Sequence, residues 1–243
     1  MRRRSAIGHR GDRRVWLGAR YPVLMRRGAI VLLGLWCGVA GAQGVHPVTG
    51  RVYAGVMCAD GADWLTRPER EAEEQPDEAL RVLHIVKGST VADIGAGSGY
   101  LTWRLAHLVG PGGKVYANDI QPKMIALLQQ NMAKRKIVNV EPVLGAVDDP
   151  KLPRAAIDLA LLADVYHEFS EPRKMLRHIR ESLKPDGRLV LLEYRGEDPS
   201  VPIRPEHKMT VAQVKAEVEP EGYRLDRVLE NLPRQHILIF RLQ

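Results

Sequence analysis

Short apolar runs alternate with amphipathic stretches from about residue 76 to the end of the chain. The run DLALLA at 158–163 is apolar after its first residue, which predicts a strand covered on both faces. Within 122–135 apolar residues recur every three or four positions, which predicts a helix with one buried stripe. Strands that alternate with helices predict an α/β protein with a mostly parallel sheet and helices on both faces.

The same reading places the remaining elements. Strands are expected at 90–94, 114–117, 138–144, 158–163, 188–193, 223–229 and 236–242, and helices at 100–108, 122–135, 172–183 and 210–219. A further helix is expected to start at Pro76, with Ala79, Leu80, Leu83 and Val86 on its apolar stripe. The last two strands follow one another through a short loop, which predicts an antiparallel edge.

The basic residues are unevenly distributed. The chain has 36 Lys and Arg against 29 Asp and Glu, a formal charge of +7. Nine of the basic residues and a single acid lie in 1–42, which leaves 27 basic against 28 acidic residues in the rest. Because the body is nearly neutral and only 5% of the chain is aromatic, a nucleic-acid partner is not expected.

The N-terminus has the three parts of an export signal. Arg26 and Arg27 precede the uncharged run GAIVLLGLWCGVAGA, which ends in the small residues Ala40–Ala42. The run is shorter than the roughly 20 residues that a spanning helix needs. We expect 1–42 to be a cleaved signal and the protein to be exported, into the periplasm if the source is a Gram-negative bacterium. An uncleaved membrane anchor is the alternative, and Met25 is a more economical start for either.

The body then divides into two parts. Residues 43–75 are expected to form an irregular and partly helical extension, and 76–243 the main domain. Membrane contact is expected only through the N-terminal segment, if that segment is not cleaved.

A glycine-rich turn follows the first predicted strand and opens the next helix. Its glycines are Gly95, Gly97 and Gly99, and Asp93 precedes them. Glycines there permit tight backbone geometry and close approach of a ligand. The spacing departs from the dinucleotide pattern G-x-G-x-x-G, because Tyr100 occupies the place of the final glycine. A nicotinamide-dependent oxidoreductase is therefore disfavoured.

Two further acids stand after the next two predicted strands. Asp119 comes twenty residues after Gly99, where a carboxylate can accept hydrogen bonds from both hydroxyls of a ribose. Asp148 follows the third strand and is a candidate acceptor for an adenine amino group. Each acid alone is equally well explained as a helix cap or turn former. Three acids at one edge of an open α/β sheet favour a ligand site.

Five segments together resemble the successive motifs of class I S-adenosylmethionine-dependent methyltransferases. The segments are VADIGAGSGYLTWRLA, KVYANDIQPKMI, VLGAVDDPKLP, DLALLADVYHEF and LKPDGRLVLLEYR. The similarity covers about residues 76–243, and the nearest branch is the small-molecule one that includes ubiquinone and menaquinone biosynthesis methyltransferases. The resemblance implies a Rossmann-like, seven-stranded, mostly parallel sheet with an antiparallel C-terminal hairpin and helices on both faces.

The resemblance also implies S-adenosylmethionine as the cofactor and a set of residues that bind it. These residues are Asp93, Gly95, Gly97, Gly99, Asp119, Ile120, Asp148 and Asp164. The glycine turn would pass under the methionine portion, with Asp93 facing its amino group and Asp164 nearby. Asp119 would hold the ribose, while Ile120 and Asp148 would contact adenine. Asn118 stands where the family often has an apolar residue, which leaves the ribose contact in place.

Chemistry on the acceptor is expected from the segment after the fourth predicted strand. Methyl transfer from a sulfonium is a direct displacement, so the protein aligns the reactants and supplies a base where the acceptor must lose a proton. His167 is the preferred base, since the ordinary histidine pKa of about 6.5 suits proton uptake near neutrality. A structural histidine at a helix start is the alternative. Glu168 either binds the acceptor or caps a helix, and Tyr166 either lines the acceptor pocket or fills space.

A second cluster follows the fifth predicted strand, with Glu193 at its start and Arg204, His207 and Lys208 further on. Arg204 and Lys208 would recognise an anionic acceptor, unless they are solvated loop charges. Residues 234–236 are placed in the same region as a guess. No Cys and His residues have the spacing of a zinc site, so no metal is expected.

The leading hypothesis is a methyltransferase that acts on a small-molecule acceptor. A non-catalytic cofactor-binding module of the same fold is the alternative, and a protein or lipid methyltransferase is a further one.

Overall fold

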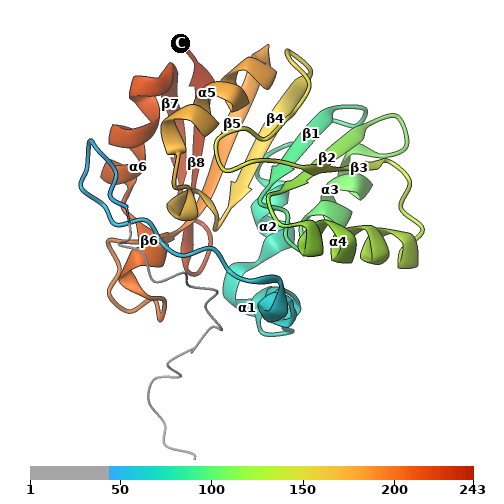
Figure 1. The fold of residues 1–243 in the computed structure, drawn as a ribbon, viewed down its shortest axis with the longest axis horizontal. Coiled ribbons are helices and arrows are strands. Elements are labelled where there is room, and N and C mark those ends of the chain that lie inside the picture. Colours follow the sequence, from blue (N-terminus) through green and yellow to red (C-terminus); the bar gives the residue numbers. More distant parts are fainter. Residues whose placement is uncertain (1–43) are drawn as a thin grey trace, which may run out of the picture. The chain divides into compact units, whose positions relative to one another are not determined.

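One sheet carries the fold across the described residues (Figure 1). The computed structural model describes residues 44–243, and the predicted export signal lies outside this range. The strands are β1 (Thr90–Ile94), β2 (Lys114–Asp119), β3 (Val140–Leu144), β4 (Ile157–Ala163), β5 (Leu183–Arg195), β6 (Lys208–Met209), β7 (Tyr223–Leu229) and β8 (Gln235–Leu242). Within residues 44–243, none of the helices combines the length and the apolar character needed to span a bilayer.

The strand order is β3-β2-β1-β4-β5-β8-β7, with β6 paired to the end of β5. The neighbours among β1 to β5 are parallel, and β8 is antiparallel to both β5 and β7. The predicted sheet and its C-terminal hairpin are confirmed. Two details differ from the prediction: β6 is an additional strand, and β5 begins at Leu183, ahead of the predicted strand start at 188.

The strand order reverses beside β1, and this reversal positions the site. The chain runs outward from β1 through β2 to β3, and then returns to the other side of β1 with β4. In open α/β sheets, such a reversal leaves a crevice at the carboxyl ends of the two central strands, where ligands bind. These ends point down in Figure 1, toward α1 (Arg70–Glu74).

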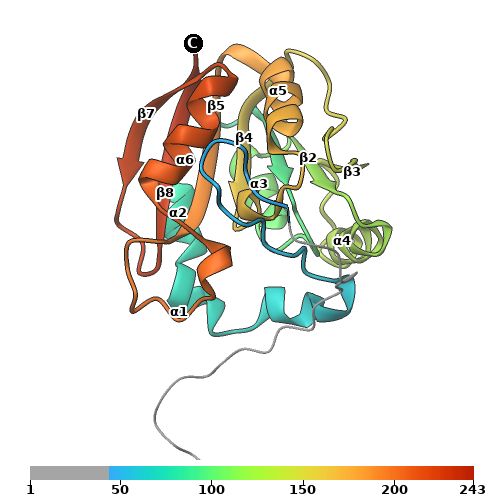
Figure 2. The same cartoon turned by 60° about the vertical axis from the view of Figure 1, so that its left-hand side comes forward.

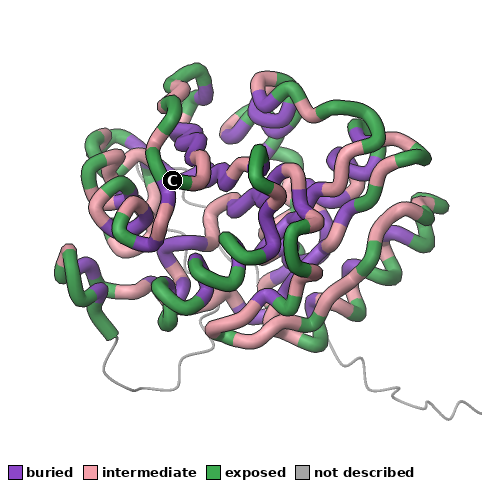
Figure 3. Tube along the Cα trace, turned by 90° about the horizontal axis from the view of Figure 1, so that it is seen from above, coloured by how far each residue is buried: buried purple, intermediate pink, exposed green. Residues whose placement is uncertain are grey.

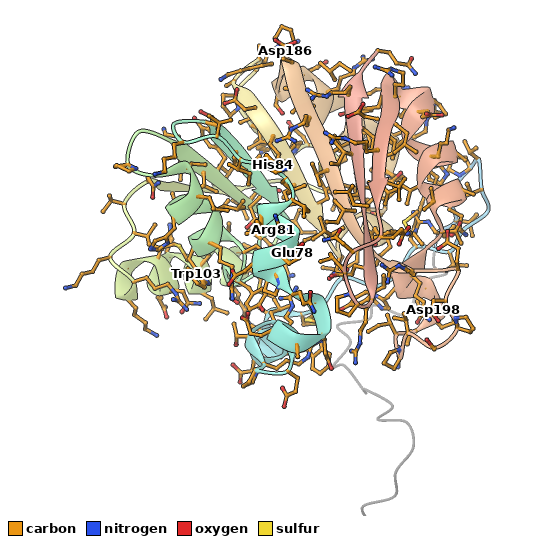
Figure 4. All side chains as sticks on the ribbon, turned by 180° about the vertical axis from the view of Figure 1, so that it is seen from behind. Glu78, Arg81, His84, Trp103, Asp186 and Asp198 are labelled. Carbon is orange, nitrogen blue, oxygen red and sulfur yellow. The ribbon has the colours of Figure 1, made fainter. Side chains whose placement is uncertain are left out.

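Helices cover both faces of the sheet, as predicted. The α-helices that follow α1 are α2 (Pro76–Arg81), α3 (Thr102–Val109), α4 (Pro122–Lys134), α5 (Pro172–Ser182) and α6 (Val211–Val218). The 3₁₀ helices are η1 (Ala59–Thr66), η2 (Tyr166–Glu168), η3 (Pro205–His207) and η4 (Glu219–Glu221). α2 and α3 pack on one face with Leu161 of β4, and α5 and α6 pack on the other with Leu162. Figure 4 looks onto the first face, and Figure 3 shows buried and exposed stretches alternating along the chain.

Local sequence explains several helix ends. α4 begins with Pro122, at a position whose N–H would have no partner inside the helix. Thr210 caps α6, because its hydroxyl accepts from the Gln213 amide while the Gln213 side chain accepts from the Thr210 amide. α2 stops at Arg81, earlier than the apolar stripe suggests. Val86 is therefore 72% exposed, and its predicted burial is wrong.

The extension before α1 crosses the carboxyl edge of the sheet from α6 toward α4 (Figure 2). At one end, Arg51 donates to both carboxylate oxygens of Glu217 on α6, from Nε at 3.1 Å and Nη2 at 2.8 Å. The Glu217 side chain is completely buried and that of Arg51 is 5% exposed. At the other end, the Ala59 amide donates to Gln121 Oε1 at 3.2 Å, just before α4. A buried ion pair therefore anchors a segment that has little regular structure.

We expect Glu217→Ala to lower the free energy of unfolding by about 3–5 kcal/mol, because it leaves the buried Arg51 guanidinium without its counter-charge. The double variant Arg51→Met/Glu217→Leu should recover most of that loss, since it removes both buried charges. Urea unfolding followed by circular dichroism measures both.

The matched control for this prediction is Glu78→Ala, which breaks an exposed pair with Arg81 on α2 (Figure 4). Exposed pairs contribute about 0–1 kcal/mol, so little change is expected. Equal losses for Glu217→Ala and Glu78→Ala would contradict the anchoring role of the buried pair.

Candidate active site

The glycine turn after β1 packs too tightly for side chains. Gly95, Gly97 and Gly99 have φ angles of 73°, 55° and 90°, a region that favours glycine. A Cβ on Gly95 would lie 2.4 Å from Val165, in the segment after β4. One on Gly97 would lie 2.8 Å from Leu65 of η1. The turn is thus enclosed between the loop that follows β4 and the N-terminal extension.

Asp119 ties the end of β2 to this turn. Its Oδ2 accepts from the Gly97 amide at 3.0 Å, and its Oδ1 accepts from the Gln121 amide at 2.9 Å. Burial raises the pKa of Asp119, although these amide donors favour its ionised form. Each carboxylate oxygen keeps a second lone pair for a ligand. The structure therefore places Asp119 against the glycine turn, where the sequence predicts it.

Asp93 lies beneath the same turn at the end of β1. Its Oδ2 accepts from the Thr102 hydroxyl at 2.6 Å, and the side chain is almost fully buried. Burial raises the pKa of Asp93 to about 6, and the neighbouring charge of Asp119 adds to the shift. This carboxyl group is held by a hydroxyl donor, so it orients the start of α3 as well as facing the crevice.

Asp164 follows β4 with an unusual backbone, φ 52°. Its Oδ2 accepts from Gln235 Nε2 at 2.7 Å and lies 3.9 Å from Arg70 Nη2. Its Oδ1 is buried and has no hydrogen-bond partner among the described residues. The pKa of Asp164 is raised to about 8. Burial is the main cause, the charges of Glu74 and Glu193 add to the shift, and Arg70 offsets only part of it. A buried carboxyl group with one free oxygen is thus available to a cationic ligand.

The two predicted adenine contacts are less enclosed. Ile120 is half-buried after β2. Asp148 is also half-buried, and its Oδ2 lies 3.9 Å from Lys174 Nζ on α5. The structure places both at the carboxyl edge, and their contact with adenine stays a prediction.

On the acceptor side, His167 is held by a buried carboxylate that the sequence does not link to it. His167 Nδ1 lies 2.6 Å from Oε2 of Glu193, whose Oε1 accepts from the Tyr166 amide at 3.1 Å. Glu193 is completely buried at the end of β5. Burial opposes the charge of His167, but Glu193 outweighs it and raises the pKa of the imidazole. β5 thereby fixes both the position and the ring orientation of His167.

The other nitrogen of His167 faces a second histidine. His167 Nε2 lies 3.1 Å from Nδ1 of His207 in η3, and the two rings meet edge to face with centroids 5.0 Å apart. Burial lowers the pKa of His207 to about 4, and the charge of His167 contributes. A carboxylate oxygen of Glu168 lies within 4.8 Å of a ring nitrogen of each of these two histidines. Residues 40 positions apart in the chain therefore meet here, which chain spacing alone does not reveal.

Tyr166 requires a correction. Its side chain is completely buried in the core on the α5 and α6 face, with its ring 5.6 Å from that of Phe169 in edge-to-face contact. A ring in this position holds the turn after β4 in place. It does not line a pocket for an acceptor, because it is fully buried between core side chains and the buried Arg51 guanidinium, 5.8 Å from the ring centroid.

The charges proposed for an anionic acceptor are engaged within their own loop. Arg204 Nη1 lies 3.7 Å from Glu206, and Lys208 Nζ donates to the Asp198 carbonyl at 3.0 Å. Gln235, by contrast, contacts the site, because its Nε2 donates to Asp164. Of the predicted residues 234–236, this one therefore lies at the site. The extension also contacts the acceptor side, where the Ala54 amide donates to the His167 carbonyl at 3.0 Å.

Comparison with known proteins identifies the family. Residues 85–231, more than half of the chain, match a family model described as a methyltransferase domain. The ubiquinone/menaquinone biosynthesis C-methyltransferase UbiE of Escherichia fergusonii is 31% identical over 109 residues, which are 44% of this chain and 43% of that protein. The UbiE of Salmonella arizonae gives the same figures. The chain thus spans less than half the length of these curated relatives.

Solved structures agree on the fold. A SAM-dependent methyltransferase from Aquifex aeolicus superposes with a TM-score of 0.73 at 27% identity, covering 77% of this chain and 100% of that chain. A putative type 11 methyltransferase from Sulfolobus solfataricus, 20% identical, shares the fold with a TM-score of 0.58 over 70% of this chain and 94% of that one. The chain belongs to the family of S-adenosylmethionine-dependent methyltransferase domains.

Proposed function

We propose that the chain transfers the methyl group of S-adenosylmethionine to a small-molecule acceptor by direct displacement. The observation that carries this proposal is a set of three carboxyl groups, the buried Asp93 and Asp119 and the 14% exposed Asp164, around a glycine turn at the carboxyl ends of β1 and β4. The methyl donor brings ribose hydroxyls, an ammonium group and a positively charged sulfur. Carboxylates in a closed site complement both the hydroxyl donors and the positive charge.

The residues present fit this cofactor. The Oδ1 of Asp164 is buried without a partner, so it offers an acceptor to an ammonium group. Asp119 has lone pairs free on both oxygens, beyond those used by the amides of Gly97 and Gln121. The glycines let the turn pack directly against Asp119, whose Oδ2 accepts from the Gly97 amide at 3.0 Å.

When bound, the cofactor supplies a methyl group on a positively charged sulfur, which leaves as a neutral thioether with the electron pair of the broken carbon–sulfur bond. The residues of the chain orient the donor and exclude water. Asp119 and the glycine turn fix one end of the donor, and Asp164 balances its charge. The acceptor would approach from the side of His167, so that its reacting atom lies in line with the methyl group.

The acceptor class is inferred from charge and from relatives. The residues after the predicted signal are nearly neutral, and the charges Arg204 and Lys208 are engaged locally, so a small uncharged acceptor fits better than nucleic acid. The relatives from Escherichia fergusonii and Salmonella arizonae are named for quinone biosynthesis, which supports a small molecule. A cofactor-binding module without turnover remains the alternative. Export of the protein stays a prediction from residues 1–42.

We expect Asp119→Ala to weaken S-adenosylmethionine binding at least tenfold, measured by titration calorimetry on the full chain. The change removes charge-assisted hydrogen bonds to the ribose, each of which contributes about 1.5–3 kcal/mol, and tenfold corresponds to about 1.4 kcal/mol. Asp119→Asn keeps one carbonyl acceptor and should lose less.

The control for Asp119 is Asp186→Ala, an exposed aspartate at the opposite edge of the sheet (Figure 4). This variant should bind the cofactor as the wild type does. If the folded wild-type chain binds no S-adenosylmethionine, the proposed function is wrong. If it binds but transfers no methyl group across an acceptor panel, the non-catalytic alternative gains support.

Binding of the cofactor should release protons near pH 7. The pKa of Asp164 is raised to about 8, so its carboxyl group is mostly protonated at pH 7 in the free protein. A neighbouring ammonium group favours the ionised form and lowers this pKa. Affinity should therefore rise with pH up to about 8 and then level off. Asp93, with a pKa of about 6, is already mostly ionised in this window.

Calorimetry at pH 7 in two buffers with different ionisation enthalpies measures this release directly. Asp164→Asn should abolish it and flatten the pH dependence between pH 7 and 8, because the amide does not titrate. Equal proton release by the wild type and by Asp164→Asn would assign the titration to another group.

A further inference from the structure

We infer that His167, Glu168 and His207 form a binding site for a divalent transition-metal ion, with Zn²⁺ as the expected occupant, beside the methyl-donor site. Each of the three side chains offers one ligand atom, and these atoms all lie within 4.8 Å of one another. Two imidazoles and one carboxylate are a donor set that suits Zn²⁺. The prediction of no metal from the sequence considered only spacing along the chain, and His207 lies 40 residues from His167.

The two imidazole nitrogens are already close to the separation that a shared ion requires. Nε2 of His167 and Nδ1 of His207 are 3.1 Å apart. Two nitrogens on a tetrahedral Zn²⁺, each about 2.0–2.1 Å from the ion, would be about 3.4 Å apart. The observed separation, at which the two nitrogens share a hydrogen bond, is therefore a few tenths of an ångström shorter than the separation that an ion requires.

Glu193 prepares His167 for this role. Its Oε2 lies 2.6 Å from Nδ1 of His167, and both side chains are buried. A proton held between this carboxylate and Nδ1 leaves the lone pair on Nε2, the nitrogen that faces His207. Metal-binding histidines commonly donate their other N–H to a carboxylate in this way, which orients the ring and raises its basicity.

The fold brings the three ligands together from two elements. His167 and Glu168 belong to η2, where Nη1 of Arg51 donates to the His167 carbonyl at 3.0 Å. His207 ends η3 and directly precedes β6, which pairs with the end of β5. Glu193 lies in that same part of β5. The pairing of β6 with β5 thus brings His207 to the His167–Glu193 pair. This positioning is the structural role of the two-residue strand β6.

Three protein ligands leave a position on the ion open, as in catalytic rather than structural zinc sites. An oxygen or sulfur atom of the acceptor bound there would lose its proton more easily, because the ion lowers the pKa of a bound group. In this arrangement His167 holds the ion and does not itself take the proton. This role toward the acceptor rests on the proposed function, whereas binding of the ion does not.

The test uses the full chain, stripped of metal with a chelator and dialysed. Titration calorimetry with Zn²⁺ alone, with elemental analysis after gel filtration, should give one ion per chain. Co²⁺ in place of Zn²⁺ should give the visible absorption bands of a tetrahedral site with nitrogen ligands. This spectrum is recorded on the wild type, so it does not depend on whether a variant folds.

Variants assign the ion to the three ligands. His207→Gln and Glu168→Gln should each weaken Zn²⁺ binding by about 100-fold or more, and Glu193→Gln by about 10- to 100-fold through the orientation of His167. The matched control is His178→Gln on α5, an exposed histidine 3.8 Å from Glu181. This control should bind Zn²⁺ as the wild type does.

Calorimetry with S-adenosylmethionine on metal-free His207→Gln and Glu168→Gln separates the two hypotheses. Normal cofactor binding with lost Zn²⁺ binding supports the metal site and shows that the variant is folded. A wild-type chain that binds the cofactor but retains no stoichiometric Zn²⁺ overturns the metal site and restores His167 as the candidate base. Zn²⁺ binding that His207→Gln and Glu168→Gln leave unchanged also overturns it. Zn²⁺ binding without cofactor binding contradicts the proposed function alone.

Discussion

The carboxyl edge of the sheet gathers four acidic side chains at the ends of neighbouring strands: Asp93, Asp119 and Glu193, which are buried, and Asp164, which is 14% exposed. Burial of a carboxylate is costly unless donors or cations compensate it. The raised pKa values of Asp93 and Asp164 express this cost. The strand order causes this cost, because the reversal beside β1 brings the carboxyl ends of the strands, and so their acidic side chains, close together. A ligand that carries hydroxyl donors and positive charge relieves it, so the site favours such a ligand before any specific contact is considered.

The extension before α1 completes this enclosure. The family model matches residues 85–231, so the segment that covers the crevice lies outside the matched part. It is held by Arg51 and Glu217 at one end, and Leu65 contacts the glycine turn at the other. Both anchors are side-chain contacts to the family domain, since the segment has little regular structure of its own. The extension therefore packs against residues that the family domain contributes to the site.

Most of the fold could be predicted from the sequence, because buried strands and amphipathic helices have distinct local patterns. The positions of Asp93, Asp119 and the glycine turn also follow from local order, since each acid comes at the end of a strand. The contacts of His167 could not be predicted. They depend on the register between β5 and β6 and on a loop that returns after 40 residues, and neither feature has a local pattern. The sequence left the role of Tyr166 open for a related reason, because a single aromatic residue after a strand fits a pocket and a core equally well.

Glu193 connects the two halves of the site. It faces His167 directly, and its charge also contributes to the raised pKa of Asp164. A positive charge on the acceptor side would offset the repulsion between Glu193 and Asp164. Asp164 would then ionise more easily, and its ionised form favours binding of a cationic donor. By thermodynamic reciprocity, a bound donor would favour positive charge on the acceptor side by the same factor. One buried carboxylate between the two halves therefore couples binding of the methyl donor to the state of the residues that face the acceptor.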